Sequence, residues 1–167
     1  MNKSAQTWIF DYLAAFLMFF FLLIISISLL SSIDAKSDYE DISREVDLVS
    51  SALMSEGFPI NWSSSSVILP GLLKNNRLDY DKLAEFDSLG YARSKALLHV
   101  RGDYFFYFKD SSGVMNVSGK CVRGYDFTGC EVPSVSSVAP SHTDRAWTER
   151  IIVVDSKIVS MVLVVWR

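Results

Sequence analysis

The chain opens with an uninterrupted apolar run. From Tyr12 to Leu30 there is no charged residue, proline or glycine. At a rise of about 1.5 Å per residue, a helix of about 20 residues crosses a hydrocarbon core about 30 Å thick. A cleaved secretory leader has a core of only about 7–15 residues before a small-x-small site. The nearest such site, SSIDAK, has Ile33 where a small residue is required. The pattern therefore predicts a permanent transmembrane helix over residues 6–33.

The membrane run leads without a helix breaker into a region where apolar residues recur at spacings of three and four. This spacing places them on one face of a helix, with charged residues around them. Gly57 and the pair Phe58-Pro59 end the pattern. We therefore expect residues 34–56 to continue the same helix and to pack on the domain formed by residues 57–167. The apolar stripe consists of Ala35, Tyr39, Ile42, Val46, Val49 and Leu53.

The domain begins irregularly and then becomes helical. Residues 57–78 contain two prolines, a serine run and an Asn-Asn pair, which favour turns and loops. Asp79 is an N-cap residue for a helical stretch over residues 80–100, which Gly90 breaks or bends. Its inward-facing positions are Leu83, Phe86, Leu89, Leu97 and Leu98.

The second half of the domain has the composition of strands. Aromatic residues 104–109 and the segment 114–118 are predicted to pair across the turn DSSG. Residues 146–154 and 158–167, joined across Asp155-Ser156, predict an antiparallel hairpin. Residues 131–145, EVPSVSSVAPSHTDR, form a Ser/Pro-rich surface stretch. The sequence thus predicts an α+β fold, with a long N-terminal helix on a four-stranded antiparallel sheet.

The last predicted strand is apolar on both faces, so we expect it to be covered on both sides. The amphipathic half of the long helix can cover one side; the pattern does not identify what covers the other. Val159, Met161, Leu163 and Val165 form one face, and Ile158, Val162, Val164 and Trp166 form the other.

Composition argues against nucleic-acid binding and against catalysis. The 167-residue chain has a net charge of −3, and its 16 Lys and Arg residues form no run. His99 and His142 have no acid or cysteine at ligand spacing, and the serines form no Gly-x-Ser-x-Gly elbow. The triplet RGD at residues 101–103 is interpreted as the lead-in to a strand. We expect no enzymatic activity, no metal and no cofactor.

Cys121 and Cys130 lie in CVRGYDFTGC with eight residues between them. Two readings are open: a disulfide, which suits an oxidising exterior, or two free thiols. A metal site would need further ligands that the sequence does not place nearby. By the loop-entropy estimate, a disulfide here would contribute about 2–3 kcal/mol.

The charges flanking the apolar run indicate its orientation. Lys3 and the terminal amine precede the run, and IDAKSDYEDISRE, with its acidic excess, follows it. The positive-inside tendency places the N-terminus in the cytoplasm and the C-terminal domain outside the cell. The sequons at Asn61 and Asn116, as possible glycosylation sites, agree with that placement.

The layout of a long N-terminal helix, apolar first and then laid on an antiparallel sheet, resembles the type IV pilin fold. The segment KSAQTWIFDYLAAF is similar to the processing region (class III signal peptide) of archaeal pilins and pilin-like proteins. The resemblance implies a leader peptide of residues 1–5, with Lys3 as the basic residue, Ala5 as the small residue and Gln6 as the mature N-terminus. It implies that Asp11 is the acid of the helix, at the sixth mature position, whereas the family usually has a Glu at the fifth. The implied partners are membrane lipid, a prepilin peptidase, other pilin-like subunits and pilus assembly proteins.

Asp11, directly before the apolar run, has two interpretations. An ionised carboxylate in hydrocarbon costs several kcal/mol unless it is paired. In an assembly, the terminal amine of a neighbouring subunit could pair with it, which would set the register between subunits. Alternatively, Asp11 is hydrated at the cytoplasmic interface near Lys3.

Three functional classes follow from these patterns. The first is a minor structural subunit of an archaeal type IV pilus or a related surface assembly. The second is a non-polymerising, single-pass anchored domain that binds a partner outside the cell. The third is an anchored subunit of an envelope enzyme or transporter.

Overall fold

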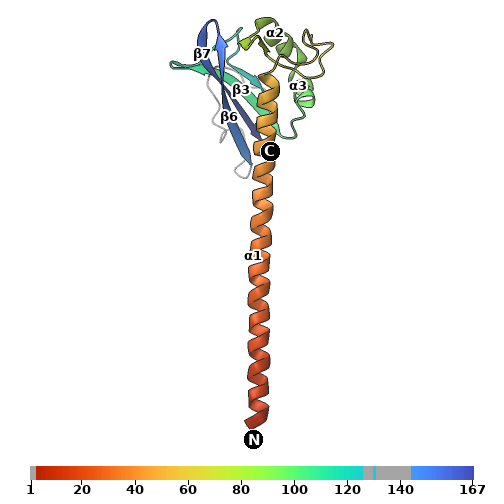
Figure 1. The fold of residues 1–167 in the computed structure, drawn as a ribbon, viewed down its shortest axis with the longest axis vertical. Helices are drawn as coiled ribbons and strands as arrows, with labels where there is room; N and C mark the ends of the chain where they lie inside the picture. Colours follow the sequence, from red (N-terminus) through yellow and green to blue (C-terminus); the bar gives the residue numbers. More distant parts are fainter. Residues whose placement is uncertain (1–2, 126–129, 131–143) are drawn as a thin grey trace. The chain divides into compact units, whose positions relative to one another are not determined.

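The computed structural model describes the backbone of residues 3–125, 130 and 144–167 (Figure 1). Side chains are described for the same residues except 3–10 and 30–39. The chain divides into two compact units, Met1–Asp38 and Tyr39–Arg167. Most of the predicted Ser/Pro-rich stretch, including His142, lies outside the described residues.

The first unit consists of the N-terminal part of helix α1 (Lys3–Leu53). Its residues Asp11–Leu29 are long and apolar enough to span a membrane, and none of this segment is buried within the protein. Large aromatic and aliphatic side chains point outward all round, among them Phe16, Phe19 and Leu22. Apolar exposure on every side is the pattern expected of a helix surrounded by lipid.

The second unit is built on one curled sheet of seven strands. Figure 1 labels its three long strands, β3 (Asp103–Asp110), β6 (Arg145–Val154) and β7 (Lys157–Trp166). The four short strands are β1 (Leu73–Lys74), β2 (Arg77–Leu78), β4 (Gly113–Val114) and β5 (Val122–Gly124). The order across the sheet is β1-β2-β6-β7-β3-β4, and β5 pairs with β3.

The predicted C-terminal hairpin is confirmed. Strands β6 and β7 pair antiparallel from Val154↔Lys157 to Arg145↔Trp166. The two turn residues, Asp155 and Ser156, both have positive φ, of 47° and 66°. This backbone conformation gives a two-residue turn whose twist matches that of the strands it joins. On its other side, β7 pairs antiparallel with β3 over seven residue pairs.

The prediction of a four-stranded, fully antiparallel sheet is wrong. The sheet has seven strands, and β2 pairs parallel with β6. Strands β1 and β2 lie in the segment predicted to be irregular, where Asn75 and Asn76 adopt φ of 51° and 60° and form a tight turn. Two-residue strands are too short to show alternation in sequence, so the pattern could not reveal them.

The predicted strand over residues 114–118 is also wrong in extent. Only Gly113–Val114 pairs with β3 as a strand, after which Val117 and Lys120 form a bridge of their own. Strand β5, from the predicted cysteine loop, takes the rest of that edge of β3. The hydrophobic pattern could not reveal which short segment would pair with this edge of β3.

The predicted contact between the amphipathic helix and the sheet is confirmed for the described residues. The stripe residues Ile42, Val46, Val49 and Leu53 are buried in the main core. The same core contains Val159, Met161, Leu163 and Val165 from one face of β7. The side chains of Ala35 and Tyr39 lie outside the described set.

Two short helices close the main core. In α2 (Tyr80–Leu89), the Asp79 carboxylate accepts hydrogen bonds from the N–H groups of Asp81 and Lys82, as expected of an N-cap. Gly90, with φ of 72°, ends α2 and precedes α3 (Tyr91–Leu97). Of the predicted inward-facing residues, Leu83, Phe86, Leu89 and Leu98 are buried, and Leu97 is half-buried.

The second face of β7 is covered by a smaller cluster. Phe105, Cys121 and Val122 pack there with Val162, Val164 and Trp166. The prediction that β7 is covered on both sides is therefore confirmed along most of the strand. It is wrong for Ile158, which is 76% exposed because it lies beside the turn, beyond this cluster.

The RGD triplet leads into a strand, as predicted. Gly102 is buried and Asp103 is the first residue of β3. A Cβ on Gly102 would overlap the carbonyl oxygen of Trp166, so only glycine fits where the two chain segments cross. This packing is unlike that of an exposed adhesive loop.

We predict that Gly102→Ala lowers the free energy of unfolding by about 1–3 kcal/mol, because the new methyl group forces the backbone of Trp166 to move. Denaturant unfolding of the full chain in detergent, followed by near-ultraviolet circular dichroism, measures the change. Ser111→Ala, at an exposed turn, is the control and should change stability little. Equal stability of the two variants would contradict the packing argument.

Candidate functional site

Asp11 is the first residue of the membrane-spanning segment Asp11–Leu29. Its side chain is exposed, and it has no hydrogen-bond or ion-pair partner among the side chains that the structure describes. Lys3, Ala5 and Gln6 lie in the first turns of α1, with side chains outside the described set. Processing at Gln6 and pairing of Asp11 therefore stay predictions.

Cys121 and Cys130 form a disulfide, with their Cα atoms 5.0 Å apart. Cys121 is buried in the cluster on the second face of β7, and Cys130 is exposed. The bond therefore ties a surface residue to the sheet beside β5. Of the two alternatives for these cysteines, the structure has the disulfide, which is consistent with an extracellular domain.

The two sequon asparagines are both accessible. Asn61 lies in a turn of the loop after α1, and Asn116 follows β4; both are exposed. Neither side chain has a hydrogen bond within the described part of the protein. Accessibility is a requirement for modification, and the attachment of sugars stays a prediction.

Sequence reasoning missed a buried cation, Arg123 on β5. Its side chain is only 1% exposed, and its Nε lies 3.1 Å from an Asp87 carboxylate oxygen. It also donates to the carbonyl oxygens of Val117, at 2.6 Å, and Lys120, at 3.3 Å. The guanidinium thereby joins α2 to the chain between β4 and β5. The available signal in the sequence was the position of Arg123 in CVRGY, where a charged residue stands between apolar residues, two positions after Cys121.

A second polar cluster joins α3 to the start of β3. The hydroxyl of Tyr91 and the ammonium of Lys95 both donate to Asp103 Oδ1, at 2.7 and 2.8 Å. Partial burial pushes the Asp103 pKa upward, but these two hydrogen bonds outweigh it, so the pKa lies below its usual value. Burial, together with the bond to Asp103, raises the pKa of Tyr91.

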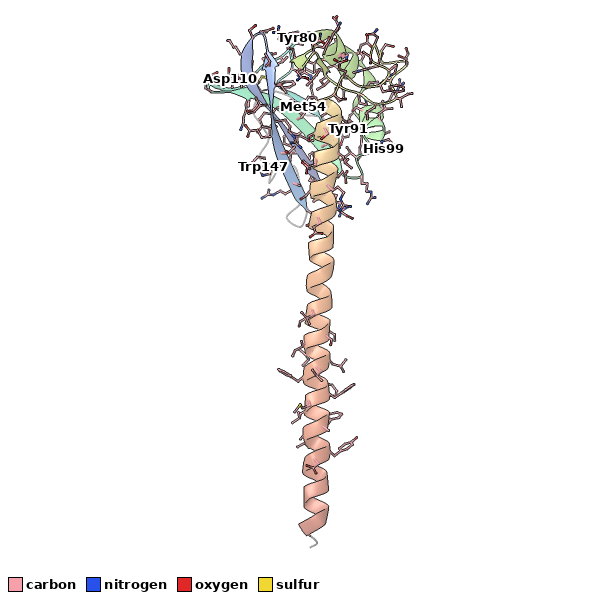
Figure 2. The ribbon with its side chains drawn as sticks, in the orientation of Figure 1. Met54, Tyr80, Tyr91, His99, Asp110 and Trp147 are labelled. Carbon is pink, nitrogen blue, oxygen red and sulfur yellow. A yellow bond between two sulfur atoms is a disulfide. The ribbon has the colours of Figure 1, made fainter. Side chains whose placement is uncertain are left out.

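The hydroxyls of Tyr104 and Ser94 are 2.6 Å apart inside the same region, and burial raises the pKa of Tyr104 to about 12. The ring of Tyr91, labelled in Figure 2, has its centroid 5.6 Å from that of Tyr104. Both tyrosines are therefore neutral at physiological pH. Tyr91 donates to Asp103, and Tyr104 shares a hydrogen bond with Ser94, so both hold α3 on β3.

A hollow of about 730 Å³ lies between these two clusters and the disulfide. Its lining includes Asp87, Tyr91, Arg123 and Tyr125. The charged groups already bond to one another or to backbone carbonyls, and no buried side-chain nitrogen or oxygen in the described part lacks a partner. The charged groups that line the hollow therefore already have hydrogen-bond or ion-pair partners, and we interpret their role as stabilising the fold.

No metal-binding group of three or more His, Cys, Asp or Glu occurs among the described residues. His99, labelled in Figure 2, is exposed at the end of α3, and its Nδ1 lies 3.1 Å from the carbonyl oxygen of Leu97. The expectation that the chain is not an enzyme stays a prediction.

Comparisons with protein-family models, with curated proteins and with solved structures found no match.

We predict that Asp103→Asn lowers the free energy of unfolding by about 1 kcal/mol at pH 7, because the charged acceptor of two hydrogen bonds is lost. Asp103 is partly exposed to solvent, which keeps the effect small. Its folded-state pKa lies below the ordinary value of 3.8. Its stabilising effect is therefore complete above that value and is lost as the pH falls through the folded-state pKa.

Denaturant unfolding of the unchanged protein and of Asp103→Asn, in detergent at pH 7 and pH 3, measures this effect. The difference between their free energies of unfolding should be smaller at pH 3. Asp41→Asn, on the exposed face of α1, is the matched control. If this difference in free energy of unfolding is the same at both pH values, the negative charge of Asp103 does not contribute to stability.

Proposed function

We propose that this protein is a pilin-like, minor structural subunit of an archaeal type IV pilus or a related surface assembly. It would be anchored by the N-terminal helix, with the C-terminal domain outside the cell. The observation that carries the proposal is the continuation of an apolar helix, with an acid at its start, into a helix that packs on a sheet. A non-polymerising anchored domain has the same layout, so the tests below address processing and assembly.

The position of Asp11 favours a partner from another subunit over one in its own chain. If Gln6 is the mature N-terminus, its amine lies five residues before Asp11. Five helical residues correspond to about 500° of rotation, which leaves the two groups about 140° apart around the helix. The amine of a neighbouring subunit has no such restriction. Pairing there would remove the cost of holding two separate charges near hydrocarbon.

The first prediction from this proposal is that the mature chain begins at Gln6. The basis is the arrangement Lys3-Ser4-Ala5-Gln6 ahead of the apolar helix. Mass spectrometry of the intact protein from its native membrane measures the N-terminus directly. A native chain that still begins at Met1 or Asn2 would favour the non-polymerising anchor.

The second prediction is that Asp11→Asn reduces incorporation of the subunit into an assembly and leaves folding of the outer domain unchanged. The variant loses the negative charge but keeps a polar side chain of the same size. The measurement is the amount of subunit in surface-sheared or co-purified complexes, relative to its total level in the membrane.

Asp11→Glu is the matched control, since it keeps the charge and should incorporate better than the Asn variant. Folding is followed through the Cys121–Cys130 disulfide, which should stay closed to alkylation in every variant. If the Asn variant incorporates as well as the unchanged protein, Asp11 is only a hydrated residue at the interface.

A further inference from the structure

The sheet face that points away from α1 carries an open hollow of about 370 Å³. Side chains alternate along β6: Arg150 bonds to Asp47 and Ser50 of α1, so its neighbours in sequence point to the opposite face. Trp147, labelled in Figure 2, lies on that outer face and is 68% exposed. We call the hollow beside it the Trp147 trough.

Strand register defines the shape of the trough. Val162 and Val164 of β7 lie at its base, where both side chains are buried. Trp147 and Glu149 of β6 are the register partners of Val164 and Val162 on one side, and on the other side Tyr107 of β3 is the partner of Val162. Because adjacent strands lie about 4.8 Å apart, the backbones of the two flanking strands are about 10 Å apart. The accessible apolar surface of the trough is therefore the indole of Trp147, which is large enough to stack on one ring-shaped group.

Charged groups close the two ends of the trough. Lys109 Nζ and Glu149 Oε2, 2.9 Å apart, form an ion pair between β3 and β6, and β7 lies between these two strands. Arg145 lines the trough from the start of β6 and has no ion-pair partner in the described part of the chain. Two cations and one anion leave a net positive charge, which favours a ligand that carries an acid.

The trough also contains two hydrogen-bond donors that have no partner among the described residues. The hydroxyl of Tyr107 and the indole N–H of Trp147 make no hydrogen bond among the described residues. An apolar side chain seated here would cover these groups and the ion pair without giving them partners, at a cost in free energy. A ring with one apolar face and a polar rim would satisfy both the aromatic walls and the donors.

We propose that the Trp147 trough binds a uronic acid residue of an extracellular polysaccharide. The apolar face of the sugar ring lies on the indole of Trp147, and Arg145 pairs with the carboxylate. Tyr107, Lys109 and Glu149 take the ring hydroxyls. This inference goes beyond the proposed function, because it requires only that the outer domain is accessible, whether or not the chain assembles.

The test is isothermal titration calorimetry of the full chain in detergent with two acidic probes, tri-galacturonate and a hyaluronan octasaccharide. A neutral chito-oligosaccharide of equal length is the comparison ligand. We expect at least one acidic probe to bind about tenfold more tightly than the neutral one, and its affinity to fall with added salt.

Three variants separate the roles of the trough residues. Trp147→Ala should weaken binding of the acidic probe at least about tenfold, and Trp147→Phe should retain part of the affinity. Arg145→Gln should reduce the preference for the acidic probe over the neutral one. Ile158→Ala, on the same sheet face but outside the trough, is the matched control and should bind normally.

The proposal is overturned if neither acidic probe gives measurable heat at 10 mM. It is also overturned if Trp147→Ala binds the acidic probe as well as the unchanged protein. Equal affinity for acidic and neutral probes, unaffected by Arg145→Gln, would rule out acid recognition. Binding of a short aromatic peptide, lost in Trp147→Ala while the sugars do not bind, would identify a peptide site instead.

Discussion

The second unit depends on the packing of one helical stripe against one face of β7. Ile42, Val46, Val49 and Leu53 share a core with Val159, Met161, Leu163 and Val165. The contact spans most of β7, and β7 in turn pairs along nearly its whole length with both β6 and β3. Removal of apolar surface from water is the main driving force here. Polar bonds from Arg150 to Asp47 and Ser50 fix β6 to the same helix.

Near the end of α1, a buried charge stabilises this packing by bonding to backbone carbonyl groups. The last carbonyl groups of a helix lack intrahelical partners and carry a partial negative charge. Leu72 N–H donates to the carbonyl oxygen of Leu53, and Lys82 Nζ donates to those of Glu56 and Leu73. Lys82 is buried, yet its ammonium is satisfied by backbone oxygens of two segments. Arg123 joins α2, through the Asp87 carboxylate, to backbone carbonyls of the chain before β5, so both buried cations act as cross-links.

The two faces of the sheet have different uses. The inner face is filled by α1 and the short helices, and within the described part of the chain every buried polar side-chain atom has a partner. The outer face is covered in part by the cluster around Phe105 and Trp166, and leaves Trp147, Ile151 and Ile158 exposed. The Trp147 trough, which we propose as a sugar site, lies on this outer face, where exposed aromatic surface coincides with donors that have no partner among the described residues.

The sequence alone determined the features that rest on long, regular patterns. The apolar run, the helical stripe, the Asp79 cap and the β6–β7 hairpin each follow from residue spacing or turn chemistry within one segment. Only the tertiary structure decided the features that need two distant segments: the seven-stranded sheet with its parallel β2–β6 pair, the Arg123–Asp87 contact and the Trp147 trough. The physical reason is that short strands, buried ion pairs and hollows depend on which side chains meet in space. Spacing along the chain specifies the face on which a side chain lies, but not its neighbour across the fold.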